Sequence, residues 1–131
     1  WTLWILRFQI AVTYVYAGIA KLNGDWLLDA QPLRTWLRAW GHLPGIGSWL
    51  TEVWVAYLMS WGGALFDLGI VCLLLSPRWR LVGLMLALAF HVVTGALFDI
   101  GVFPLVMLIS ITLFCEPTWP ERWGALWMTS S

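Results

Sequence analysis

The chain has 131 residues, of which 61% are hydrophobic and only 11% are charged, and its mean hydropathy is +0.81. Because an ordinary soluble domain is about one quarter charged, this composition excludes that class and predicts an integral, multi-pass membrane protein. Seven basic and seven acidic side chains balance, so the charge gives no reason to expect binding to nucleic acid. The 12 tryptophans suit the aromatic belts that form where helices meet the lipid headgroups.

The first apolar segment, residues 1–22, is long enough to cross a bilayer core of about 30 Å at about 1.5 Å per residue. It carries several side chains that are unusual for a helix facing lipid. At about 100° per residue, a stripe roughly 60° wide contains Arg7, Tyr14, Gly18 and Lys21. We expect this stripe to face other parts of the protein.

Lys21 stands at the end of this segment, directly before the turn formed by Asn23 and Gly24. A charge at that depth is costly, and two interpretations account for it. The side chain either reaches the headgroups or lies in a site lined by apolar helices. In the second case the surroundings disfavour the charged amine, which is how a lysine becomes a general base near neutral pH.

Residues 32–40 predict a short amphipathic helix that begins at Pro32. Tryptophan on its apolar face and arginine along its edge are typical of a helix that lies in the membrane interface rather than spanning it. The loop that follows contains His42, which we expect to be exposed and without a ligand role.

Three further apolar segments, residues 53–75, 81–98 and 100–114, predict additional transmembrane helices. The first of them contains the pair Gly62-Gly63, where a neighbouring helix is expected to approach closely. The last is short and contains Pro104. The fold class is therefore all-α: a bundle of about four transmembrane helices with one interfacial helix, over residues 1–115. Residues 116–131 are expected to form an interfacial C-terminal tail.

Alternation of the spans across the membrane places Arg7 and Asp67 at depths that differ by only about 5 Å. Charges inside a membrane usually pair with one another or mark a pathway. We therefore predict an ion pair between Arg7 and Asp67, and favour a structural role for it over a catalytic one.

Toward the opposite membrane face, Lys21 shares its depth with His91 and Asp99, and Tyr14 and Tyr16 lie near. Lys21 is the candidate base and His91 its candidate support, while Tyr14, Tyr16 and Asp99 are candidates for binding a cofactor. A buried histidine bonded to a backbone carbonyl is the alternative for His91, and a turn or cap role is the alternative for Asp99. Histidines in separate segments make no ligand motif, so no metal is predicted.

The stretch 14–27, Tyr-x-Tyr-Ala-Gly-x-x-Lys-Leu-Asn-x-Asp-Trp-Leu, resembles the lysine-bearing motif of the vitamin K-dependent γ-carboxylase family. That family includes bacterial relatives with the horizontally transferred transmembrane domain. Further matches in the same order are Phe66-Asp-Leu, Phe90-His91, Leu97-Phe-Asp-Ile-Gly-Val-Phe-Pro104, Val106-Met-Leu108 and Leu113-Phe-Cys-Glu-Pro-Thr-Trp-Pro120. The combination covers most of the chain and is more specific than any single piece.

The resemblance implies that Lys21 is the base that deprotonates a reduced vitamin K-type quinol, the expected cofactor. In the family, oxygen then reacts and a strongly basic alkoxide removes a γ-proton from a substrate glutamate. Carbon dioxide adds to the carbanion and the quinone leaves as its epoxide. If the chain is catalytic, the resemblance implies a quinol-epoxidising γ-glutamyl carboxylase-like lyase, in the inner membrane if the chain is a bacterial relative.

Two departures from the family leave other readings open. The family has further spans before this region and a large extramembrane portion after it, so the chain is expected to be a fragment or a shortened relative.

The pattern Arg7…Tyr14-x-x-Ala-Gly-x-x-Lys21 is also similar to the DoxX-like family of small membrane subunits, some of them linked to quinone or thiol redox chemistry. A third reading is a non-catalytic accessory subunit. The expected partners are accordingly the lipid bilayer, a quinone, and other membrane subunits or missing parts of a longer chain.

Overall fold

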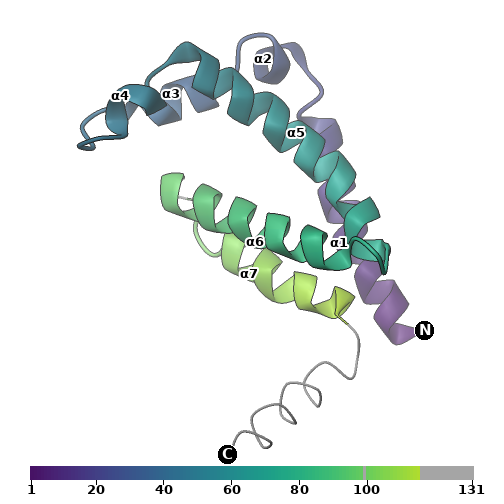
Figure 1. Ribbon diagram of the computed structural model, residues 1–131. Helices are drawn as coiled ribbons and strands as arrows, with labels where there is room; N and C mark the ends of the chain where they lie inside the picture. Colours follow the sequence, from purple (N-terminus) through teal and green to yellow (C-terminus); the bar gives the residue numbers. More distant parts are fainter. Residues whose placement is uncertain (99, 116–131) are drawn as a thin grey trace, which may run out of the picture.

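The computed structural model describes residues 1–98 and 100–115, and every regular element in these ranges is helical (Figure 1). The described elements are α1 (Thr2–Ala20), α2 (Gly24–Leu27), α3 (Leu33–Arg38), α4 (Gly47–Leu50), α5 (Val53–Leu75), α6 (Arg80–Leu97), α7 (Phe103–Ile111) and the 3-10 helix η1 (Thr112–Phe114). The predicted all-α class is confirmed. Asp99 and the predicted tail, residues 116–131, lie outside the described residues.

Three of the helices, α1, α5 and α6, are long and apolar enough to cross a membrane. α1 lies within the predicted span 1–22, α5 matches the span 53–75, and α6 begins and ends one residue before the span 81–98. Large apolar side chains cover their outer faces; Phe8, Leu65 and Met85 each expose about two thirds of their surface. A soluble monomer rarely exposes so much contiguous apolar surface, so these faces suit contact with lipid.

The fourth predicted span differs in length from the sequence expectation. Gly101, at a φ of +61°, makes a turn, and α7 begins only at Phe103 with Pro104 in its first turn. Together α7 and η1 rise by about 18–20 Å, less than a bilayer core of about 30 Å. They form an apolar hairpin with α6 rather than a helix of full spanning length (Figure 1).

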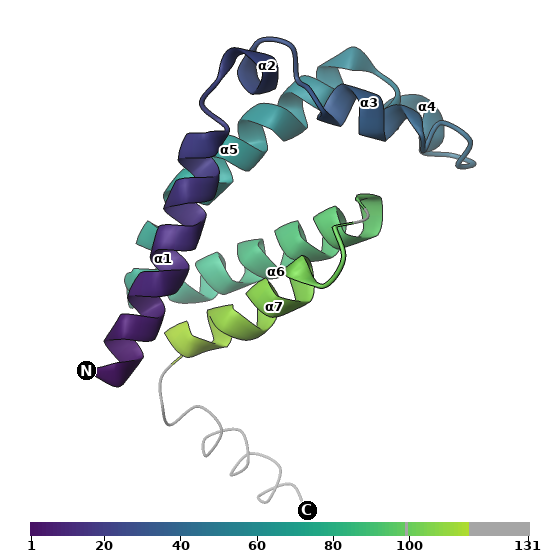
Figure 2. The same cartoon turned by 180° about the vertical axis from the view of Figure 1, so that it is seen from behind.

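Close packing of α1 on α5 sets the register of the bundle (Figure 2). A Cβ atom added to Gly18 would lie 2.7 Å from the side chain of Leu68 and 3.2 Å from its backbone nitrogen. Small residues permit this kind of approach between membrane helices. The approach expected at Gly62 and Gly63 does not occur, since a Cβ atom at either would meet nothing within 4 Å.

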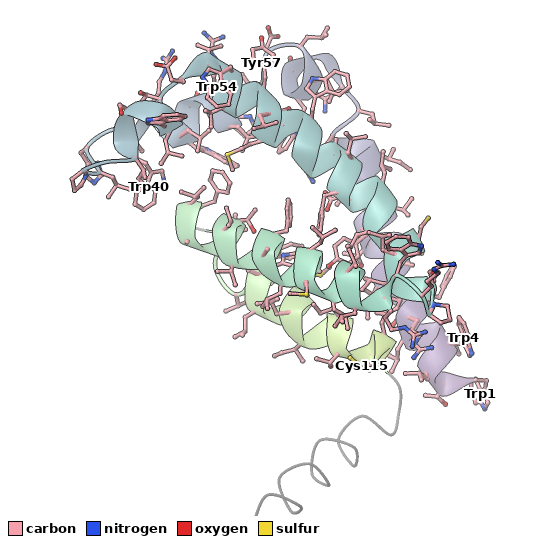
Figure 3. The ribbon with its side chains drawn as sticks, in the orientation of Figure 1. Trp1, Trp4, Trp40, Trp54, Tyr57 and Cys115 are labelled. Atoms are coloured by element: carbon pink, nitrogen blue, oxygen red, sulfur yellow. The ribbon has the colours of Figure 1, made fainter. Side chains whose placement is uncertain are left out.

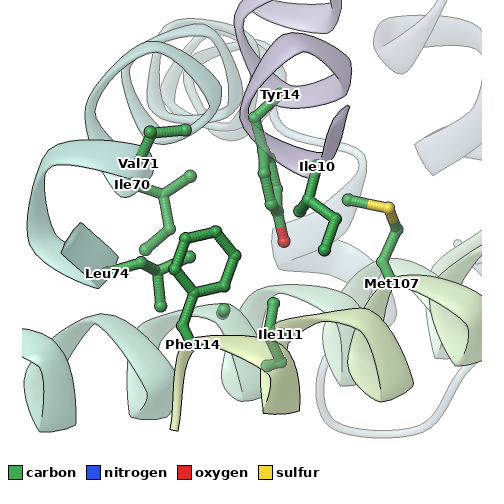
Figure 4. Packing of buried hydrophobic residues seen from close by; sticks show 9 residues of the cluster. Ile10, Tyr14, Ile70, Val71, Leu74, Met107, Ile111 and Phe114 are labelled. Carbon is green, nitrogen blue, oxygen red and sulfur yellow. The ribbon is translucent and has the colours of Figure 1, made fainter. Parts of the chain in front are cut away.

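The main core lies where α5, α6 and α7 meet the middle of α1 (Figure 4). Its buried members are Ile10, Tyr14, Ile70, Val71, Leu74, Ala87, Met107, Ile111 and Phe114. From the turn between α5 and α6 these two helices diverge, so their other ends are held apart (Figure 1). That divergence leaves the space in which the site lies.

The connection between α1 and α5 folds along the first half of α5. The predicted amphipathic helix is present as α3, with Leu33 and Leu37 buried, and α2 and α4 are short helices that the sequence pattern had not indicated. Indole N–H groups fasten this connection to the spans. Trp26 Nε1 donates to the carbonyl of Ser60 at 2.9 Å, and Trp40 Nε1 donates to that of Leu97 at 2.6 Å.

Candidate functional site

A cavity of about 700 Å³ lies between the diverging halves of α5 and α6. Side chains of both helices point into this space (Figure 3). Its walls are mostly apolar and aromatic, and α1, α3 and α7 also contribute to them. Gly62 and Gly63 line part of the wall, where they have no side chain to fill the space. Cavities of this size and apolar character are typical of sites for small molecules.

Lys21 lies on the wall of this cavity and forms a salt bridge with Asp67, its amine donating to the carboxylate Oδ2. Asp67 is 4% exposed. The amine also donates to the carbonyl of Ala17 at 3.3 Å and lies 5.2 Å from the centroid of the Trp26 ring. The side chain therefore turns back toward its own helix and the cavity, as the buried-site interpretation requires, rather than extending toward the headgroups.

The predicted ion pair between Arg7 and Asp67 is wrong. Asp67 is paired with Lys21, whereas Arg7 donates from Nε to the carbonyl of Leu113 at 2.8 Å and from Nη2 to that of Cys115 at 3.2 Å. These carbonyls belong to η1 and its C-terminal cap, where the orphan acceptors of a helix terminus need donors. Arg7 is thus a structural residue that caps this end of the hairpin.

The reason for the error is the offset between α1 and α5. The first half of α5 runs past the end of α1, alongside the connecting helices (Figure 2). The contact between Gly18 and Leu68 consequently brings Asp67 level with the last turn of α1. Alternation of the spans had aligned the start of α1 with the end of α5 at one membrane face, which assigned Asp67 to a partner several turns too far away.

A second polar pair borders the cavity: the hydroxyl of Tyr14 and Nε2 of His91 are 2.9 Å apart. Tyr14 is 1% exposed and His91 3%. The structure therefore brings Tyr14, His91 and Lys21 to one cavity, but His91 lies level with Tyr14 and not at the depth of Lys21. The partner of His91 is a side-chain hydroxyl and not the backbone carbonyl of the alternative interpretation.

Tyr16, a candidate for cofactor binding, does not reach the cavity. It is 73% exposed on the outer face of α1, because two residues correspond to about 200° around a helix and turn it away from Tyr14. Asp99, the other such candidate, lies outside the described residues. His42 is exposed in its loop, as expected, with Nδ1 2.9 Å from the carbonyl of Ala39.

Two aromatic residues of the site had no role assigned from sequence. The rings of Phe66 and Phe90 stack, with centroids 3.9 Å apart and an angle of 14° between their planes. Each stands directly before a polar residue of the site, Asp67 and His91. The sequence did contain a signal for these two rings. Each aromatic residue directly precedes a polar residue inside an apolar span, so the ring and the polar group lie near the same wall of the cavity.

The fold and the site together define a helical membrane protein with an apolar cavity bordered by a buried ionic pair. Residues 1–119 match the HTTM domain, the domain of vitamin K-dependent γ-carboxylase-like proteins, and the chain belongs to this family. The match covers the transmembrane part, as the resemblance indicated. No solved structure matches the chain.

Proposed function

We propose that the cavity binds a flat quinol-type ligand and that Lys21, acting with Asp67, takes a proton from a hydroxyl of that ligand. The observation that carries the proposal is the position of the Lys21–Asp67 pair on the wall of a largely apolar cavity. Family membership supports it, and so does the resemblance of residues 14–27 to the lysine-bearing motif of the carboxylases, whose lysine corresponds to Lys21.

The residues of the cavity suit a quinol of the vitamin K type. The volume of about 700 Å³ lies within the range of about 300–1,000 Å³ for small-molecule pockets. The stacked rings of Phe66 and Phe90 offer an aromatic surface, and the missing side chains of Gly62 and Gly63 leave room beside them. When bound, such a quinol supplies the oxygen-dependent chemistry by which the family carboxylates glutamate.

Asp67 changes what Lys21 has to do as a base. The salt bridge has no net charge. Even so, burying two opposite charges in apolar surroundings costs desolvation free energy. Passing one proton from Nζ of Lys21 to Oδ2 of Asp67 yields an amine and a carboxylic acid, both neutral. The amine is then free to accept a proton from a ligand hydroxyl, and the cation that results lies next to the negative charge left on the ligand.

A non-catalytic membrane subunit, or a DoxX-like redox-associated one, is the second candidate. The observation that favours it is the pairing itself, because a lysine held by a carboxylate also serves as a purely structural contact. The cavity beside the pair favours the first candidate, since a structural contact alone requires no such space. For the first candidate, other subunits or other parts of a longer chain would supply the further spans and would bind the glutamate substrate and carbon dioxide.

Quinol epoxidation by the protein in lipid nanodiscs separates the two candidates. Reduced naphthoquinol is added with oxygen, and the epoxide is measured by chromatography. We expect epoxide formation that falls by at least about tenfold in Lys21→Ala, as typical for loss of a general base. Arg38→Ala, at an exposed position of α3, is the control and should retain it. Binding of the quinol without turnover in the unaltered chain would favour the subunit.

A further inference from the structure

The proposed proton transfer uses only one of the two polar pairs that border the cavity. Tyr14 precedes Lys21 by seven residues, so the Tyr14–His91 pair lies about two turns of α1 away from the Lys21–Asp67 pair. The ring of Phe66 packs against both members of the second pair, with centroid distances of 6.0 Å to Tyr14 and 6.2 Å to His91. The second pair is thus packed against an aromatic wall residue and takes no part in the proton transfer proposed above.

The direction of the hydrogen bond between Tyr14 and His91 follows from what each side chain has to offer. A phenol hydroxyl donates one proton, whereas a neutral imidazole has one nitrogen that donates and one that accepts. Within the described ranges, Nε2 of His91 is the partner of the Tyr14 hydroxyl. If Nε2 carried the proton, the buried hydroxyl of Tyr14 would be left without an acceptor, which is costly. Tyr14 therefore donates and Nε2 accepts.

With Nε2 as the acceptor, neutral His91 carries its proton on Nδ1. In the part of the chain that the structure describes, no fully buried side-chain nitrogen or oxygen is without a hydrogen-bond partner. The hydrogen bonds among the described residues include none from Nδ1 of His91. His91 lines the cavity, so its imidazole borders the space in which a ligand would lie.

We propose that Nδ1–H of His91 donates a hydrogen bond to a ligand oxygen at the end of the cavity remote from Lys21, and that Tyr14 is a positioning residue that sets this tautomer. The proposal rests on the proposed function and adds the recognition of a second oxygen. Lys21 and His91 together then select a flat ring with oxygens at opposite positions, a 1,4-quinol, over a ring with a single hydroxyl.

The tautomer is measured without any ligand, by the nitrogen chemical shifts of ¹⁵N-histidine-labelled protein. His42→Gln leaves His91 as the sole histidine. We expect a protonated Nδ1 and a bare Nε2, and a mixture of tautomers when Tyr14→Phe is added. Tyr16→Phe is the matched control, since Tyr16 lies on the outer face of the same helix and should leave the spectrum unchanged. A protonated Nε2 in the unaltered pair would overturn the proposal.

The ligand contact is tested by anaerobic calorimetry in nanodiscs with 2-methyl-1,4-naphthoquinol and 2-methyl-1-naphthol, which differ only in the second hydroxyl. We expect the quinol to bind about tenfold more tightly, the effect of one hydrogen bond to a buried donor, and this preference to vanish in His91→Leu. His91→Asn keeps a donor near the position of Nδ1 and should retain most of the preference. In that background Tyr14→Phe should have no further effect, because there is no imidazole tautomer to set.

The outcomes separate this proposal from the proposed function. Equal binding of quinol and naphthol would overturn the His91 contact and leave the proton transfer at Lys21 in place. Binding of neither ring would overturn the proposed function together with the contact. A loss of quinol preference in Tyr14→Phe that persists in the His91→Asn background would assign Tyr14 a purely packing role and overturn its part in setting the tautomer.

Discussion

At the scale of single residues, the polar groups of the spans act in separate pairs. Lys21 is held by Asp67 and His91 by Tyr14, while Arg7 is occupied with the carbonyls that end the α7–η1 segment. Each pair meets the need of buried polar groups for partners in its own way. The ionic pair is the one whose disruption leaves a charge without compensation.

Asp67→Asn is expected to destabilise the protein by about 3 kcal/mol, because it leaves the Lys21 ammonium beside a neutral amide in apolar surroundings. The measurement is the free energy of unfolding in mixed micelles titrated with denaturing detergent. The double variant Lys21→Met with Asp67→Leu removes both charges and should recover most of the loss. A cost below about 1 kcal/mol for Asp67→Asn would contradict a buried pair.

At the scale of elements, one close contact between α1 and α5 decides which side chains meet. Gly18 lies against Leu68, and this contact brings Asp67 beside Lys21 instead of Arg7. The pair Gly62-Gly63, by contrast, borders the cavity. Glycine in these spans therefore serves two purposes, helix contact in one place and open space in the other.

Gly18→Ala is expected to destabilise the protein by about 1–3 kcal/mol, the usual cost of overpacking, because the new Cβ would lie 2.7 Å from the side chain of Leu68. Gly69→Ala is the matched control on α5, where a Cβ meets nothing within 4 Å, and it should be neutral or slightly stabilising. Thermal unfolding in detergent compares the two. If Leu68→Ala added to Gly18→Ala restored no stability, the contact would not be the cause.

At the scale of the whole molecule, the cavity exists because α5 and α6 meet at one end and diverge at the other (Figure 1). Contacts from the connecting segment bridge this diverging end. Trp40 Nε1 donates to the carbonyl of Leu97, and the ring of Trp36 lies 5.4 Å from that of Phe98. Residues Trp36 and Phe98 both line the cavity, so this bridge borders the space in which a ligand would lie.

Trp40→Phe is expected to loosen this bridge while keeping an aromatic ring, since phenylalanine lacks the N–H that reaches Leu97. Naphthoquinol should then both bind and dissociate about threefold to tenfold faster, the change expected for one hydrogen bond lost from this bridge. Stopped-flow quenching of tryptophan fluorescence measures both rates. Trp49→Phe, at an exposed position of α4, is the control. Unchanged rates in Trp40→Phe would show that this end of the cavity is not the path of entry.

Local sequence information determined the membrane class, the three long spans and the stripe that carries Tyr14 and Lys21. These features depend on composition and on the helical period, which act within a single segment. The same period would have shown that Tyr16 faces away from Tyr14, two residues earlier on the same helix. The family resemblance singled out Phe66 and Phe90, each next to a polar residue, but it indicated no role for either ring.

Only the tertiary structure decided that Asp67 belongs to Lys21 and not to Arg7, and that His91 is bonded to Tyr14. Alternation of spans predicts approximate depth, but the offset between two helices depends on where their side chains interlock, here at Gly18 and Leu68. A shift of a few residues along a helix changes which charges meet, since each residue adds about 1.5 Å. The identity of the ionic pair at the cavity was therefore a property of packing between helices, which no single segment of the sequence specifies.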